Sequence, residues 1–101
     1  MSSVDPVNLT KKKIAKPNKY QVILLNDDYT TMEFVVQVLR KFFAKSNDAA
    51  HAIMLKIHFE GEAICGIYSY DVAQTKVSQV IDYSRKNDQP LMCIIREELG
   101  N

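Results

Sequence analysis

The sequence predicts an α+β fold, a two-layer domain in which helices cover one face of a small three-stranded sheet, in the order β-α-α-β-α-β. Three short apolar runs bounded by turn-forming residues predict the strands, and three longer segments with apolar residues at helical spacing predict the helices. A length of 101 residues allows one such core. We expect a flexible N-terminal tail over residues 1–19, which lack apolar periodicity, and a folded core over residues 20–101.

The first strand and the first helix should flank a polar turn. The β-rich run Tyr20–Leu25 predicts the strand, and the turn-forming residues 26–28 end it. Thr30 and Glu33 then have the spacing of a capping box, in which Thr30 caps the amide of Glu33 and the Glu33 carboxylate reaches back. A helix from about Met32 to Ala44 should follow.

The polar segment 45–48 offers N-caps for a second helix, which carries both histidines, His51 and His58, and ends near Gly61. Its apolar stripe consists of Ala49, Ala50, Ile53, Met54 and Ile57. The run Ala63–Tyr68 then predicts the second strand.

Ser69 is expected to cap a third helix with Asp71 in its first turn, where a negative charge is favourable. The buried face of this helix should consist of Ala73, Val77, Val80 and Ile81. The residues 87–90 stop the helix, and the apolar run Leu91–Ile95 predicts the third strand.

The charge is distributed unevenly along the chain. Residues 1–19 contain five lysines and one aspartate, whereas residues 20–101 contain eight basic and eleven acidic residues. An acidic core argues against a surface for duplex nucleic acid, which needs basic groups on one rigid face. A basic and aromatic segment at 40–45 could join Lys11-Lys12-Lys13 in such a surface, but its phenylalanines are better explained by helix packing.

Catalysis and metal binding are disfavoured by what the sequence lacks. Asp27, Asp28 and His58 could form an acid and base set, but no nucleophile motif or Gly-rich phosphate loop accompanies them. His51 and His58 are seven residues apart on the expected helix, so about 10 Å separates them, too far to share one ion. We therefore expect no enzymatic activity, no metal and no cofactor.

The two cysteines and the hydropathy indicate the cytoplasm. Cys65 and Cys93 lie in apolar runs without metal-ligand or redox spacing, so we expect buried, reduced thiols. No stretch of about 18 apolar residues could span a membrane, and the polar start lacks the apolar region of a signal peptide.

Several spaced motifs point to one family. The sequence resembles ClpS, the adaptor of the ClpAP protease in the bacterial N-end rule pathway, from Tyr20 to about Glu97. The resemblance rests on Asn26-Asp27-Asp28-Tyr29-Thr30 with Met32-Glu33-Phe34, on Met54 to His58, on Gly61 with Ala63-Ile64-Cys65-Gly66, on Val72-Ala73 with Thr75-Lys76-Val77, and on Pro90-Leu91 with Cys93. It implies an adaptor that captures the free N-terminal residue of other proteins.

The resemblance assigns a pocket for that residue. It implies that Asn26, Asp27 and His58 bind the α-ammonium and the first peptide group. An ammonium has three N–H donors and no acceptor, so its removal from water requires several acceptors at once. The side chain of the first residue, implied to be Leu, Phe, Tyr or Trp, should be enclosed by Thr30, Met32, Val35, Met54, Ile57 and Leu91, with Asp28 adjoining.

The resemblance also implies partners. Asp71 and Lys76 correspond to positions that contact the N-terminal domain of the ClpA unfoldase, and the tail corresponds to the extension that engages it. We expect a monomer that binds neither nucleic acid nor membrane. Thr31 stands where many relatives have proline, Asp71 where glutamate is frequent and Ile57 where valine is frequent, and the larger Ile57 should change discrimination between substrates by at most about 1–3 kcal/mol.

Overall fold

The computed structural model describes residues 19–99, and the structural statements that follow concern this part of the chain. Its elements are β2 (Lys19–Leu25), α2 (Met32–Phe42), α3 (Asn47–Glu60), β3 (Glu62–Tyr68), α4 (Tyr70–Lys86) and β4 (Met92–Glu98). This order confirms the predicted α+β fold. The tail expected over residues 1–19 lies outside the described residues except for Lys19, which begins β2.

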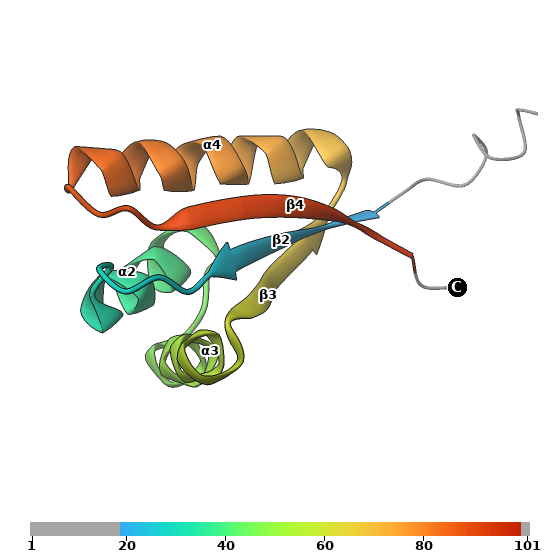
Figure 1. The fold of residues 1–101 in the computed structure, drawn as a ribbon. Helices are drawn as coiled ribbons and strands as arrows, with labels where there is room; N and C mark the ends of the chain where they lie inside the picture. Colours follow the sequence, from blue (N-terminus) through green and yellow to red (C-terminus); the bar gives the residue numbers. More distant parts are fainter. Residues whose placement is uncertain (1–18, 100–101) are drawn as a thin grey trace, which may run out of the picture.

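The three strands form one antiparallel sheet in the order β3-β2-β4, so the first strand of the core is its central strand (Figure 1). Between β2 and β3 the register shifts at Val22 and Ile23, which pair with Gly66 and Ile64 and leave Cys65 opposite no partner. The last strand is longer than expected. It continues to Glu98, opposite Lys19, because backbone pairing extends beyond the apolar run that marks the strand in the sequence.

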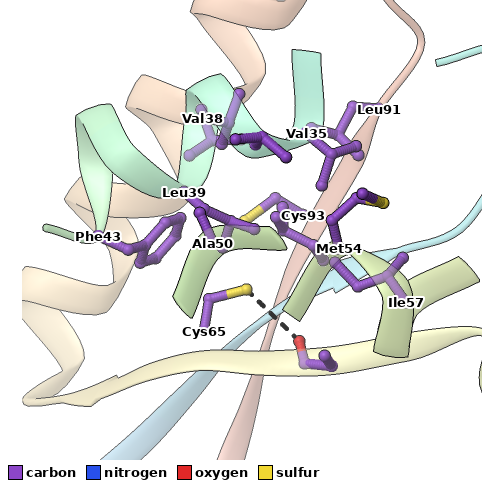
Figure 2. Packing of buried hydrophobic residues seen from close by; sticks show 14 of the residues in the cluster. Val35, Val38, Leu39, Phe43, Ala50, Met54, Ile57, Cys65, Leu91 and Cys93 are labelled. Atoms are coloured by element: carbon purple, nitrogen blue, oxygen red, sulfur yellow. Dashed lines mark hydrogen bonds between the residues drawn. The ribbon is translucent and has the colours of Figure 1, made fainter. Parts of the chain in front are cut away.

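The core lies between one face of the sheet and the helices, with α4 running along the sheet beside β4 (Figure 1). All three helices and all three strands contribute to it; the fully buried members are Val22, Leu24, Val38, Leu39, Ala50, Ala73 and Val80. Figure 2 shows α2 and α3 meeting over this core. On α4 the predicted face is partly correct, since Val77 and Ile81 are only partly buried.

The start of α2 corrects the predicted capping box. Thr31, not Thr30, is the N-cap, and its Oγ1 accepts a hydrogen bond from the amide of Phe34 at 3.1 Å. The hydroxyl of Thr30 instead points to the carboxylate of Asp27, to which it donates at 2.6 Å. The helix ends at Phe42, two residues earlier than expected, and Ala44 adopts a left-handed conformation that breaks it.

The basic and aromatic segment at the end of α2 is explained by packing, as predicted. Phe43 is buried, and the ring of Phe42 packs edge-to-face on Tyr83 of α4 with centroids 5.3 Å apart. Cys65 and Cys93 are buried free thiols, and burial raises the pKa of each to about 12. Such thiols stay protonated and unreactive at neutral pH.

Candidate functional site

A cavity of about 240 Å³ lies where the end of β2, the start of α2 and the end of α3 meet. It is lined by Asn26, Asp27, Asp28, Thr30, Met32, Val35, Met54, Ile57 and His58. All nine are residues that the family resemblance assigned to the pocket. Leu91, the tenth, does not line the cavity; it is buried in the core and belongs to the same hydrophobic cluster as Val35 (Figure 2).

Asp27 organises the polar end of the cavity through its own loop. Its Oδ1 accepts hydrogen bonds from the amides of Tyr29 at 2.8 Å and Thr30 at 2.7 Å, and its Oδ2 accepts one from the Thr30 hydroxyl. An aspartate that bonds backbone amides two and three residues ahead forms a local turn. A carboxylate offers about four lone-pair positions, so one acceptor position on Oδ2 stays available to a ligand.

The charge of Asp27 is preserved by these contacts. Burial alone would raise the pKa of this carboxyl group, but the hydrogen bonds from Thr30 and Tyr29 and the positive charge of Arg85 outweigh burial. The pKa of Asp27 is therefore lowered below its ordinary value. The polar end of the cavity carries a negative charge at neutral pH.

The other side of the polar end is fixed by the turn after α3. The backbone amide of Asn26 donates to the carbonyl of Gly61 at 2.8 Å, which ties the end of β2 to the end of α3. Gly61 has φ 95°, a left-handed conformation that glycine adopts without strain, and its amide donates back to the carbonyl of Ile57. His58 stands in the last turn of α3, directly before this bend, and so faces the loop that carries Asn26.

The apolar end is part of the core. Val35 from α2 and Met54 and Ile57 from α3 are buried members of the hydrophobic cluster (Figure 2). Residues three and four apart share a helix face, which is why α3 presents Met54, Ile57 and His58 to one cavity. Met32, at the first position of α2, is 46% exposed and forms the rim. The cavity thus joins a charged, acceptor-rich end to an apolar one.

This geometry can be compared with known proteins. A family model described as ATP-dependent Clp protease adaptor protein ClpS matches residues 15–94. The chain belongs to the ClpS family. It is 52% identical over 92 residues to the ATP-dependent Clp protease adapter protein ClpS of Parvibaculum lavamentivorans, which covers 91% of this chain and 84% of that protein. Over the same length it is 52% identical to the protein of that name from Brucella canis, covering 79% of it.

A solved structure supports the same assignment. The structure of Agrobacterium tumefaciens ClpS2 bound to L-phenylalaninamide matches with a TM-score of 0.80 and 37% sequence identity. The match covers 82% of this chain and 100% of that one. The α+β fold is therefore the fold of the ClpS family.

Asp71 and Lys76, the two residues that resemble unfoldase contacts in the ClpS family, lie on α4 and do not line the cavity. Asp71 is exposed in the first turn of the helix. Lys76 is partly buried: its Nζ donates to the carbonyl of Phe42 at 2.7 Å and lies 5.6 Å from the ring centroid of Tyr68. Lys76 therefore also binds the last carbonyl of α2.

Two residues near the cavity could not be found by sequence motif. Gln89 accepts a hydrogen bond from the amide of Thr31 through its Oε1 at 3.2 Å, across 58 positions of sequence. Arg85 donates from Nη1 to the carbonyls of Gln89 and Leu91, each at 2.9 Å. Neither lines the cavity, and only the folded arrangement brings them to the start of α2.

Residues 19–99 offer neither a metal-binding cluster nor a membrane-spanning helix. No group of three or more histidine, cysteine, aspartate or glutamate side chains there could hold a metal ion. None of the helices in this range is long and apolar enough to cross a membrane.

Proposed function

We propose that the cavity binds the first residue of proteins that carry a free α-amino group and Leu, Phe, Tyr or Trp at that position. The chain then acts as an N-end rule adaptor that delivers these proteins to the ClpA-type AAA+ unfoldase of ClpAP for degradation. One observation carries the proposal: a single small cavity joins a negatively charged, acceptor-rich end to an apolar interior. Binding pockets for drug-sized ligands have about 300–1,000 Å³, so a smaller cavity suits a single residue.

The polar end has the chemistry that an ammonium requires. A buried ammonium needs an acceptor for each of its three N–H groups and is stabilised by negative charge. The free position on Asp27 Oδ2, the side-chain carbonyl of Asn26 and one imidazole nitrogen of His58 can supply these acceptors. The side-chain NH2 group of Asn26 can also donate to the carbonyl of the substrate's first peptide bond.

The apolar end determines which side chains are accepted at the substrate's first residue. Val35, Met54 and Ile57 offer no polar partner, so a charged or strongly polar side chain would lose its hydration without compensation. The ligand of the Agrobacterium tumefaciens ClpS2 structure, L-phenylalaninamide, combines an α-amino group, an aromatic side chain and an amide. Those three groups are the ones that the two ends of this cavity would bind.

Delivery is proposed to use other surfaces of a monomeric, cytoplasmic protein. Asp71 and Lys76 would contact the N-terminal domain of the unfoldase, and residues 1–16 would engage it as an extension. Asp71→Ala is the cleaner test, because removing Lys76 would also leave the carbonyl of Phe42 without its partner. Asp71→Ala should leave peptide binding intact and weaken unfoldase binding, whereas Asp82→Ala on the same helix should change neither. Equal unfoldase binding by both variants would contradict the assignment.

The pocket is tested by fluorescence anisotropy with labelled peptides that differ only in the first residue. Peptides with Phe or Leu first should bind, those with Glu or Lys first should not, and acetylation of the α-amino group should abolish binding of all. Binding that ignores both the first residue and acetylation would contradict the proposed function. Binding of a labelled oligonucleotide that falls steeply with salt would instead favour a nucleic-acid partner.

A further inference from the structure

The backbone amide of Thr31, the N-cap of α2, has no hydrogen-bond acceptor within the first turn of its own helix. In a capping box, the side chain three positions after the N-cap accepts from the N-cap amide, and this side chain is Glu or Gln. Here the N-cap is Thr31 and the residue three positions on is Phe34, which has no acceptor. Gln89 supplies the missing acceptor from the loop between α4 and β4, with Oε1 at 3.2 Å from the Thr31 amide.

Gln89 is itself held in a fixed position. Its amide donates to the carbonyl of Ser84 at 2.8 Å, and its own carbonyl accepts from Nη1 of Arg85 at 2.9 Å. The same nitrogen bonds the carbonyl of Leu91, so Arg85 holds the middle and the last residue of this short loop. Asp88, directly before Gln89, has φ 58°, which turns the chain toward α2. The side chain of Gln89 therefore extends from a braced loop.

The bonded amide lies between two residues of the cavity. Thr30 precedes Thr31 and Met32 follows it, and both line the cavity. Fixing the Thr31 amide therefore fixes the backbone that carries the exposed rim residue Met32. The loop also leads into Leu91, which is buried in the same hydrophobic cluster as the cavity residue Val35 (Figure 2). The contact thus connects the α4–β4 loop to the rim of the cavity.

We propose that Gln89, braced by Arg85, is a positioning residue for specificity: it holds the start of α2 so that Met32 stands at a fixed height over the cavity. This inference rests on the proposed function, in which the cavity selects the first residue of a substrate. Loosening the rim enlarges the range of positions that Met32 can take. The unbranched side chain of Met32 can fit against planar or γ-branched side chains and crowds the β-branched Val and Ile, which therefore enter more readily when the rim loosens.

Gln89→Ala removes the acceptor, and Gln89→Glu keeps an acceptor at the same reach. In anisotropy titrations, Gln89→Ala should reduce the preference for a Phe-first over a Val-first peptide by about three- to tenfold, the effect of one hydrogen bond. Gln89→Glu should restore the preference. Gln79→Ala, which removes an exposed glutamine from α4, is the matched control and should behave as the wild type.

Hydrogen exchange of the Thr31 amide gives a second readout that needs no substrate. The amide should exchange slowly in the wild type and in Gln89→Glu, and at least about threefold faster in Gln89→Ala. An unprotected Thr31 amide in the wild type would overturn the inference, whatever the variants do. A changed exchange rate with an unchanged Phe to Val ratio would overturn it too, while failure of wild-type peptide binding would count against the proposed function instead.

Discussion

The polar end and the rim of the cavity are held by different kinds of contact. At the polar end, Asp27 bonds Tyr29 and Thr30, its neighbours two and three positions along the chain. At the rim, Thr31 bonds Gln89, 58 positions away. The Asp27 side of the polar end can thus form within residues 27–30, although its other side needs α3, which carries His58 and the Gly61 carbonyl that bonds Asn26. The rim takes its position only when α4 and β4 are in place. We expect changes at the polar end to affect affinity and changes at the rim to affect selectivity.

The largest expected effect comes from the polar end. Asp27→Ala removes both the negative charge and the acceptor that organise the loop, and it should weaken binding of a Phe-first peptide by about 2–5 kcal/mol. Isothermal titration calorimetry measures this loss. Asp82→Ala, which removes one acidic group from exposed α4 surface, is the charge-matched control. Unchanged affinity in folded Asp27→Ala would remove Asp27 from the site.

The rim gives the next largest effect, and it should appear as selectivity. Met32→Ala removes the side chain that narrows the entrance and should admit peptides with Val or Ile first, changing discrimination against Phe by about 1–3 kcal/mol. Competition binding with Phe-first and Val-first peptides checks this. If the variant rejects Val and Ile as strongly as the wild type does, Met32 does not exclude these side chains from the cavity. If it loses Phe binding instead, the rim contributes affinity, which contradicts the expectation that changes at the rim affect only selectivity.

A substitution in the bend after α3 should lower fold stability and leave peptide binding nearly unchanged. A β-carbon at Gly61 would meet no atom within 4 Å, so Gly61→Ala adds only the strain of a left-handed alanine. That strain should lower the free energy of unfolding by about 1–2 kcal/mol. Urea unfolding measures it. Affinity for a Phe-first peptide should change little, because the bond between Asn26 and the carbonyl of Gly61 remains possible.

The smallest effect is a pH dependence of stability. Since the pKa of Asp27 is lower in the folded state than in the unfolded one, its ionised form stabilises the fold above the unfolded value, about 3.9. This stabilisation is lost as pH falls through the folded value. The difference in unfolding free energy between wild type and Asp27→Asn should therefore be constant from pH 7 to about 5 and shrink below about 4. A difference that shrinks already between pH 7 and 5 would contradict the lowered pKa.

The difference between local and long-range contacts also explains which features the sequence could predict. Turn chemistry and apolar spacing act over a few residues, and they predicted the element order. The ten expected lining residues came from the resemblance to the ClpS family, and the structure brings nine of them to one cavity. The same local reasoning placed the N-cap at Thr30, one residue early, because it could not weigh the competing bond from Thr30 to Asp27. The extension of β4 to Glu98 depends on pairing with β2, which the local pattern does not carry.

Long-range contacts were the part that local patterns could not predict. The bond between Thr31 and Gln89 joins segments far apart in sequence, and no spacing signals it. In the sequence, only the family resemblance makes Lys76 notable. In the structure it reaches the carbonyl of Phe42, because the end of α2 lies within reach of α4. Each such contact depends on how whole elements pack.

The most direct test of the cavity's role is a titration of isotope-labelled protein with L-phenylalaninamide and with its N-acetyl derivative, followed by NMR chemical shifts. The account predicts shifts concentrated at the lining, including the side-chain amide of Asn26 and the methyl groups of Val35, Met54 and Ile57. The acetylated compound should leave the same signals unchanged, because its amide nitrogen carries no charge to pair with Asp27. Equal shifts with both compounds, or shifts confined to α4, would contradict the account.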